Sequence, residues 1–510
     1  EISCSLVGSE MCIRDRKTRY IVGLFLVGAS VLSSCSDFTE IDQKGMNLLS
    51  TTDQLEMLLN QEYNIRIADI QRVCGSVQYY PGNVGTVLAN PVKTTTQILL
   101  KYDEAGHALE QVDLTSSDSY YANCYNYIGT VANPILSLVD AATGSEEKKT
   151  ALKAEALTIR AYFHWLAAVK FTKAYDPATA DSEKSIAYVL ETQDIKQPTE
   201  QLTQKEVYEY ILADLDAAIE LNALPQSAVN RMRFNAACPH AIKAHVLMYM
   251  QQPGEAAKEA QKALAVNSSV SDYANYCTEA PSSAGILVKT FETPQLALAQ
   301  DYFTDTDVEF FSWLTPRYYE RYEQKNIQKD WFATYHTMMW MGSWETTSQV
   351  VKGALESMFG VTEGSMSYGV QGNGRVGRIN LSVPQMYLIL AENAINNNLI
   401  DDAMDYLDKI RVGRFFPEDY HALKGSVTTK NDAIEMLRKV AHGENVFNIY
   451  DFITLKRWTL LSDYKEDISW TFSGTTYTLK PESTIWVFPF PKSLMEKNGN
   501  FEHNYPVTQN

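Results

Sequence analysis

The sequence has few cysteines, and they are dispersed. The seven are Cys4, Cys12, Cys35, Cys74, Cys124, Cys238 and Cys277. No two of them have the Cys-x-x-Cys spacing of a zinc site, and their separations do not indicate a disulfide framework. The four that follow Cys35 are interpreted as scattered buried thiols, with room for one bridge in an oxidising compartment.

The sequence also lacks the common catalytic motifs. Its eight histidines are spread along the chain, and it has neither a His-Glu-x-x-His zinc motif nor a Gly-x-Ser-x-Gly nucleophile elbow. His164 falls on the aromatic face of a predicted helix and is interpreted as a packed, hydrogen-bonded core histidine. We therefore expect no enzyme activity, no catalytic residue, no cofactor and no metal site.

One glycine-rich stretch has the letters of a dinucleotide-binding fingerprint. It is GNGRVG at residues 372–377. That mechanism needs a strand before the stretch and a helix that starts at its third glycine. We expect a polar loop before it, and Pro384 follows soon after, so the stretch is interpreted as a flexible connection.

Positive charge is in short supply. The formal net charge is -18, and the first 34 residues hold four basic and three acidic side chains, so the remainder carries -19. Such an excess of negative charge argues against nucleic acid and against anionic lipid as partners.

The N-terminal region resembles a bacterial lipoprotein signal. Basic residues Lys17 and Arg19 precede an apolar run, Tyr20–Leu32, which is shorter than the ~20 residues that a membrane-spanning helix needs. The run ends in Leu-Ser-Ser-Cys, and acidic residues follow at once. Cys35 is therefore the predicted site of lipid attachment.

This interpretation divides the N-terminal region into two parts. Residues 17–34 are predicted to be the lipoprotein signal peptide, whose removal leaves the acylated Cys35 as the first residue. Residues 1–16 add two cysteines and mixed charge in front of the basic segment, and we interpret them as a non-native leader or an incorrect start.

Two stretches far apart in the chain read alike. Each of 241–264 and 388–410 has an apolar helical segment with alanine, a polar turn and a second segment with alanine. Small residues at such positions let paired helices approach closely, as in tetratricopeptide repeats. A third pair is predicted from 148–177 with 203–222, where Thr203 and Glu206 form a capping-box start.

Segments of another character interrupt these pairs. Residues 75–118, 280–385 and 459–510 are rich in Gly, Ser, Thr, Asn and aromatic residues and show little helical period. We expect long irregular insertions there, and insertions on a rigid scaffold often carry function.

Seven motifs along the chain form a recognisable set: CSDFTEID (35–42), AEALTIRAYFHWLAAVKFTKAYDP (154–177), EVYEYILADLDAAI (206–219), VPQMYLILAENA (383–394), LDKIRVGR (407–414), LKRW (455–458) and VFPFPKSLMEKNGNFEHNYP (487–506). Together they resemble the SusD/RagB family, the surface lipoproteins of Bacteroidetes that sit on a SusC-like TonB-dependent transporter. The residues at matching places include Glu155, Arg160, Tyr162, Asp214, Glu392, Arg411 and Glu444. The departures, at Tyr121, Gln385, Asn448 and Asp451, touch helix-packing positions.

The resemblance implies a mainly α fold. It predicts one SusD-like domain over 35–510, with a tetratricopeptide-like helix-pair scaffold at about 148–266 and 386–458. Long irregular insertions and minor β structure interrupt this scaffold, with ligand-binding insertions at about 75–118 and 280–385.

The resemblance also implies a function. We expect a lipid-anchored outer-membrane protein on the cell exterior that binds oligosaccharides and delivers them to a SusC-like transporter without altering them. Aromatic rings stack on sugar C–H faces while their polar edges meet hydroxyl groups. The candidate rings are Tyr79 and Tyr80 beside a Pro-Gly turn, and Trp340 and Trp344 in MMWMGSWE; the alternative for each pair is packing against the scaffold.

Three alternatives remain open at this point. A related binding protein would take peptides in place of glycans, and a protein-interaction repeat scaffold would bind only proteins. A surface hydrolase would need an acid and a base held across a sugar ring, a geometry that one sequence does not reveal. Helical aromatics such as Trp165, Tyr208, Tyr249 and Tyr387 are interpreted as core.

Overall fold

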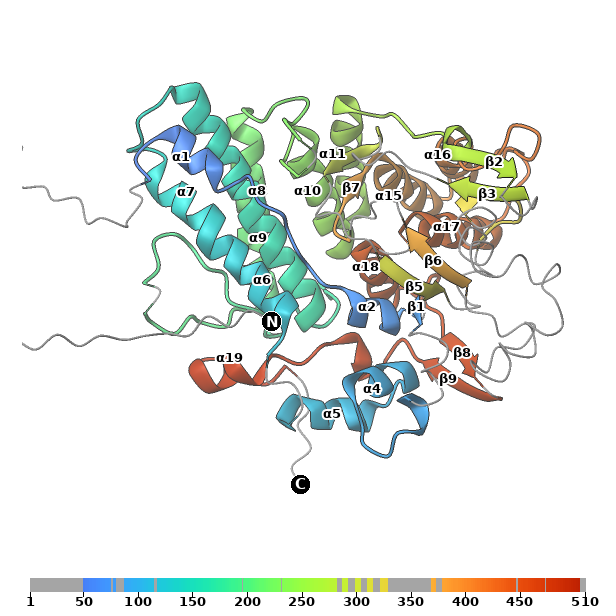
Figure 1. Ribbon diagram of the computed structural model, residues 1–510, viewed down its shortest axis with the longest axis horizontal. Helices are drawn as coiled ribbons and strands as arrows, with labels where there is room; N and C mark the ends of the chain where they lie inside the picture. The colour runs from blue at the N-terminus through green and yellow to red at the C-terminus, as the bar shows by residue number, and fades with distance from the viewer. Residues whose placement is uncertain are drawn as a thin grey trace, which may run out of the picture. The chain divides into compact units, whose positions relative to one another are not determined.

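The computed structural model describes most of the chain that follows residue 48. The described residues are 49–74, 77–78, 87–113, 117–194, 196–230, 232–281, 287–291, 299–303, 310–314, 322–328, 368–372, 378–445, 448–472 and 474–504. They belong to one unit, Leu49–Asn510 (Figure 1). Cys35, Tyr79, Tyr80, Trp340 and Trp344 lie outside the described residues.

Helices dominate the described part, as predicted. In chain order they are α1 (Thr52–Met57), α2 (Ala68–Val73), α4 (Thr95–Lys101), α5 (Glu104–Asp113), α6 (Ser119–Tyr127), η2 (Ile128–Ala132), α7 (Asn133–Leu138), α8 (Glu146–Phe171), α9 (Gln204–Leu221), α10 (Ala237–Tyr249), α11 (Pro253–Val266), η3 (Tyr273–Tyr276), α15 (Val383–Asn396), α16 (Ile400–Arg411), α17 (Lys430–Asn445), α18 (Ile449–Trp458), η5 (Thr484–Trp486) and α19 (Lys492–Lys497). Within the described residues, none of these helices is both long enough and apolar enough to cross a bilayer.

The first helix pair is built on α8, which packs against α6, α7 and α9. Ser145 caps the start of α8, and Thr203 and Glu206 form the predicted capping box of α9. From Leu152 onward nearly every residue of α8 is buried. A helix that is buried on all sides is covered by its neighbours on all sides, so α8 is the central helix of this region.

The next two pairs confirm the tetratricopeptide-like pattern. Helix α10 packs on α11, α15 packs on α16, and α11 and α15 join the two pairs. The alanines that share the same spacing, Ala244 with Ala256 and Ala391 with Ala403, are all completely buried. Their small side chains allow the close helix contacts that the sequence predicts.

Strands form a minor part of the described chain, all in antiparallel pairs. They are β1 (Val77–Gln78), β2 (Cys277–Pro281), β3 (Leu287–Phe291), β4 (Asp301–Phe303), β5 (Phe310–Leu314), β6 (Tyr368–Gly372), β7 (Leu381–Ser382), β8 (Ile468–Phe472) and β9 (Thr475–Leu479). A three-stranded sheet has the order β1-β5-β6, while β2-β3, β4-β7 and β8-β9 are two-stranded.

Two expectations about irregular segments need correction. Residues 75–118 hold the helices α4 and α5, and Thr94 caps the first of them because its side chain accepts from Gln97 N–H. Before the glycine-rich stretch 372–377 there is a strand, β6, and not a polar loop. The stretch still lacks the dinucleotide-binding context, because β6 pairs antiparallel with β5 and the next helix starts only at Val383.

Residues from the C-terminal part of the fold cap the end of α8. Lys456 Nζ donates to the carbonyl oxygens of Val169 and Thr172, at 2.7 and 2.5 Å. Phe488 N–H donates to Lys170 O at 3.1 Å, and Asn504 Nδ2 donates to Phe171 O at 2.6 Å. The final carbonyls of a helix have no partner within the helix, so these contacts from distant residues complete α8.

Candidate functional site

The candidate aromatic residues belong to two segments that meet at the sheet β1-β5-β6. Val77 pairs with Leu314 of β5, and Leu314 pairs with Tyr368 of β6, so these three residues form one row across the sheet. Gln78, next to that row, is the last described residue before Tyr79.

The second candidate segment, which connects β5 to β6, begins and ends in this same row of the sheet. Strand β5 ends at Leu314, β6 begins at Tyr368, and the connection between them contains Trp340 and Trp344. The structure therefore brings the attachment points of both candidate segments to one sheet, although the segments are more than two hundred residues apart in sequence. The four rings themselves are outside the described residues.

Helix α2 joins this sheet to the scaffold. It runs almost directly into β1, and it packs against α4 and α18. Its residues Ile70 and Val73 are buried, and Tyr102 Oη donates to Val73 O at 3.3 Å. The edge strand of the sheet is therefore held by a packed helix.

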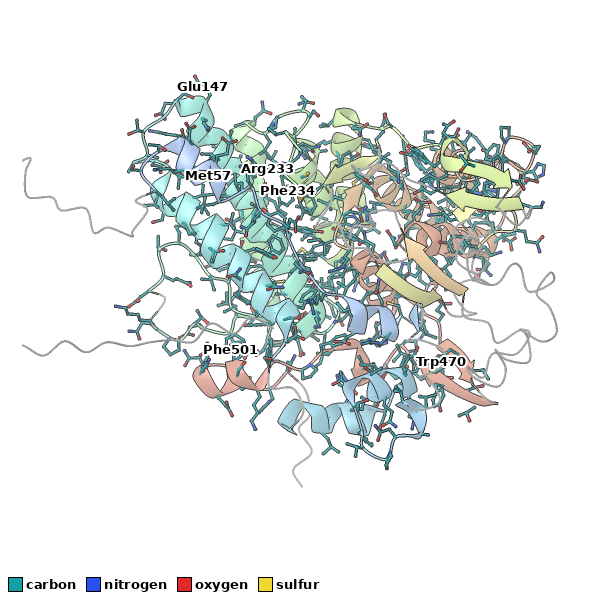
Figure 2. All side chains as sticks on the ribbon, in the orientation of Figure 1. Met57, Glu147, Arg233, Phe234, Trp470 and Phe501 are labelled. Carbon is teal, nitrogen blue, oxygen red and sulfur yellow. The ribbon has the colours of Figure 1, made fainter. Side chains whose placement is uncertain are left out.

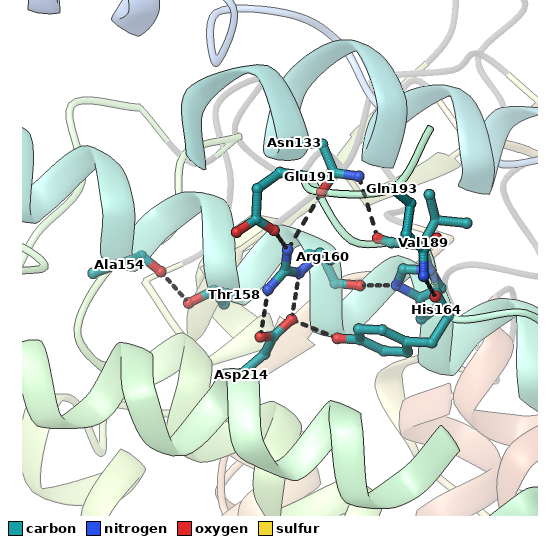
Figure 3. Close-up of polar contacts among 10 residues, drawn as sticks. Asn133, Ala154, Thr158, Arg160, His164, Val189, Glu191, Gln193 and Asp214 are labelled. Atoms are coloured by element: carbon teal, nitrogen blue, oxygen red, sulfur yellow. Dashed lines mark hydrogen bonds and ion pairs between the residues drawn. The ribbon is translucent and has the colours of Figure 1, made fainter. Parts of the chain in front are cut away.

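Most of the motif residues that carry the family resemblance form buried ion pairs. In Figure 3, Arg160 of α8 faces Asp214 of α9: Nε lies 2.6 Å from Oδ2, and Nη2 lies 2.7 Å from Oδ1. Arg160 also pairs with Glu191, and Tyr188 Oη donates to Asp214. Burial alone would lower the pKa of Arg160, but the carboxylates beside it raise that pKa overall.

Three further pairs join helices or segments that are distant in sequence. Glu155 accepts from Nε and Nη2 of Arg233, a residue that Figure 2 labels, at 2.7 and 2.8 Å. Glu392 accepts two bonds of 2.6 Å from Arg457. Arg414 donates to Glu444 at 2.6 and 2.8 Å. These bidentate pairs fix one helix against another, so the signature residues have a structural role.

His164 has the core role that the sequence predicts. Its Nε2 accepts from Val189 N–H at 2.9 Å, so Nδ1 carries the proton and donates to Arg160 O at 2.8 Å. The ring stacks on Tyr188, with 3.9 Å between centroids. Burial lowers the pKa of His164 to about 3, so the ring is neutral at physiological pH.

Other interpretations of core residues are also confirmed. Trp165, Tyr208, Tyr249 and Tyr387 are all buried. Tyr121 packs against the rings of Tyr125, Phe171 and Phe490, as expected for a packing position. Of the four described cysteines, Cys74, Cys124 and Cys238 are buried and Cys277 is partly buried.

A small cavity lies between α10, α15, α17 and α18. Its volume is about 30 Å³, and its lining includes His245, Gln385, Glu392, Asn445 and Arg457. Binding pockets for drug-sized ligands usually have volumes of ~300 Å³ or more, whereas this volume suits about one water molecule. The cavity is thus too small for a sugar.

No group of three or more His, Cys, Asp and Glu side chains could hold a metal ion within the part of the chain that the structure describes.

Several residues near the candidate site have roles that the sequence does not indicate. Arg233 and Lys456 contact partners far away in sequence, and no local pattern signals such contacts. Glu323 and Gly443, which hold part of the β5–β6 connection, were missed for the same reason.

Comparison with known proteins places this architecture. The fold resembles a SusD superfamily protein from Bacteroides thetaiotaomicron, with a TM-score of 0.60 and 15% identity over 89% of this chain and 100% of that one. A SusD superfamily protein from Bacteroides vulgatus matches with a TM-score of 0.57 and 13% identity, over 89% of this chain and 99% of that one. A SusD-like carbohydrate binding protein from the same species matches with a TM-score of 0.55 and 15% identity, over 90% of this chain and 98% of that one.

These comparisons define a class: a mainly helical protein with the SusD-like fold. Residues 42–247 match a family model described as "Starch-binding associating with outer membrane". No curated protein matches the sequence. The two comparisons agree: residues 42–247 are similar to this family, and the chain has a SusD-like fold.

Proposed function

We propose that the protein binds oligosaccharides at the outer membrane and delivers them, unaltered, to a SusC-like TonB-dependent transporter. The observation that carries this proposal is the match of residues 42–247 to a starch-binding, outer-membrane-associated family. A fold shared with a SusD-like carbohydrate binding protein supports it. The pairing of Val77, Leu314 and Tyr368, from which the two candidate segments continue, supports a shared site for them.

The candidate ligand-binding residues are Tyr79, Tyr80, Trp340 and Trp344. Each ring that stacks on a sugar adds apolar contact on one face, and the tyrosine hydroxyls add polar contacts at the edge. The predicted mode of binding is therefore led by stacking of these rings on the sugar.

The protein would be tethered through Cys35. One acyl chain gives marginal membrane binding, at about 0.8 kcal/mol per buried CH₂, so several chains on one cysteine are needed for lasting attachment. Mass spectrometry of the protein from native membranes should show an acylated Cys35 as the first residue. An unmodified thiol at that position would refute the tether without touching the binding proposal.

A binding experiment tests the function. A soluble form that starts after Cys35 is applied to an array of starch, xylan, pectin, mucin glycans and peptide pools. We expect binding to at least one polysaccharide, no release of products, and weaker binding by Trp340→Ala and Trp344→Ala. Tyr210→Ala is the matched control, because this ring is 43% exposed but lies on α9, away from the sheet.

Each outcome of the array separates the candidate functions. Binding to peptides alone would replace the glycan proposal with the peptide-binding one, and release of shortened sugars would indicate a hydrolase. Binding to glycans with unchanged affinity in both tryptophan variants would refute the site but not the function. Co-purification with an outer-membrane transporter from native membranes tests the proposed partner.

A further inference from the structure

Four helices meet around the small cavity described above. Helix α15 packs on α10 and α17, and α18 packs on the same two helices (Figure 1). The cavity at their junction has a volume of about 30 Å³. One water molecule needs roughly 10–15 Å³ of such space, so a water fits, whereas a sugar does not.

The Asn445 side chain is a buried polar group that lines this cavity without a protein partner for its oxygen. Asn445 is the last residue of α17 and is only 3% exposed. Among the described residues, no group donates a hydrogen bond to its Oδ1. Nearly all buried polar side chains have a partner, either a protein group or an ordered water. This oxygen therefore requires a small donor inside the cavity.

Other lining residues add both donors and acceptors. Glu392 accepts two bonds of 2.6 Å from Arg457 and one of 3.2 Å from Trp458 Nε1. Within the described residues, the two bonds to Glu392 leave other N–H groups of the Arg457 guanidinium available. Thr454 lines the cavity as well, and a hydroxyl can donate and accept.

The charges around the cavity balance one another. Glu392 and Arg457 carry opposite charges and pair directly. His245 also lines the cavity, and burial lowers its pKa to about 3, so the ring is neutral at physiological pH. The lining therefore has no net charge to attract an ion.

This lining selects the chemical class of the occupant. A cation would face the Arg457 guanidinium, and an anion would face the Glu392 carboxylate and the Asn445 oxygen. An apolar molecule would leave the Asn445 oxygen without a donor. Water is small and neutral, donates as well as accepts, and typically makes about three hydrogen bonds when it is buried.

We propose that this cavity is a binding site for one structural water, which donates to Asn445 Oδ1 and bonds further to Thr454 and the Glu392–Arg457 pair. The water joins the end of α17 to α15 and α18. It also solvates a buried ion pair, and the loss of solvation is the main cost of burying such a pair. This site does not depend on the proposed function.

A crystal structure of the soluble form that starts after Cys35 tests the site directly. That form contains the whole unit Leu49–Asn510. We expect one peak of water density in the cavity, within ~2.7–3.2 Å of the Asn445 side-chain amide. Crystals soaked in rubidium and bromide test for an ion, and we expect no anomalous peak in the cavity.

Two variants should displace the water. Asn445→Leu removes the amide, and Ala441→Val adds two methyl groups to a residue that lines the cavity. Asn431→Leu is the matched control for the first change, because Asn431 is exposed on α17. Ala213→Val is the control for the second, because Ala213 is exposed on α9 and tests only the lower helix propensity of valine.

Magnetic relaxation dispersion of water gives the second measurement, in solution. It counts the long-lived buried waters, and circular dichroism first shows which variants are folded. We expect one fewer long-lived water in Asn445→Leu and in Ala441→Val than in the wild type. Both controls should keep the wild-type number.

Several outcomes overturn the proposal. They are a wild-type cavity without density, an anomalous peak in it, and a water that does not contact Asn445. An unchanged number of long-lived waters in the folded variants also overturns it, whereas loss of the water in either folded variant supports it. If neither variant folds, the wild-type crystal structure alone decides.

Discussion

Asp214→Asn tests whether the motif residues stabilise the fold. Asp214 and Arg160 join α9 to α8, and their side chains are only 11% and 6% exposed. Removal of one partner from a buried pair usually costs ~3–5 kcal/mol, because the other charge is left without compensation. Arg160 keeps Glu191 in this variant, so we expect about 3 kcal/mol, the low end of that range.

The assay is unfolding in urea, followed by tryptophan fluorescence and far-UV circular dichroism. With an unfolding slope of ~3 kcal/mol per molar urea or more, this loss lowers the midpoint by at most about 1 M. Asp463→Asn is the control, because Asp463 pairs with Lys430 at the surface, where the two side chains are 50% and 37% exposed, respectively. Exposed pairs contribute ~1 kcal/mol or less, so this midpoint should hardly move.

A double variant separates charge from packing. Arg160→Met with Asp214→Leu removes both charges and leaves neither partner as an uncompensated buried ion, so it should cost less than the sum of the two single changes. If Asp214→Asn lowers the midpoint no more than Asp463→Asn does, the buried pair is not a stabilising element and the structural interpretation of the motif is refuted.

Two other predictions concern acid sensitivity and the end of α8. Burial lowers the pKa values of His164 and His245 to about 3, from 6.5. Below pH ~6.5 the unfolded state binds more protons than the folded state, so the folded state loses stability as the pH falls towards 3. The loss is about 2 kcal/mol per histidine at pH 5. Urea midpoints at pH 7 and pH 5 measure this loss, and equal midpoints would contradict it. Asn504→Ala removes the side-chain amide that donates to the carbonyl oxygens of Phe171 and Phe488. A buried carbonyl that loses its donor costs ~1–3 kcal/mol, so amide hydrogen exchange near the end of α8 should become faster. Unchanged exchange would argue that Asn504 does not cap α8.

The scaffold was largely predictable because its signals are local. The alanine spacing around Ala244 and Ala391 and the capping box at Thr203 depend on residues within one or two helical turns, and all three appear as expected. The helices α4 and α5 were missed because short helices depend more on tertiary packing than on propensity.

The candidate site was less predictable, for a different reason. The row formed by Val77, Leu314 and Tyr368 depends on strand pairing across hundreds of residues, which no local period reports. Glu323 and Gly443 meet their partners, Arg411 and Tyr322, only when residues 322–328 pack against α16 and α17. The predicted tryptophans and tyrosines were chosen by residue chemistry and by the turn beside them, and the binding experiment decides their role.

The capping of α8 has a consequence for how the chain matures. The carbonyls at the end of this central helix receive donors from Lys456, Phe488 and Asn504, which a ribosome makes hundreds of residues later. A nascent chain that stops short of Phe488 has only the Lys456 donor, so the end of its central helix is not yet complete. Full capping of α8 is therefore a late event, which must wait until residues 488–504 have been made.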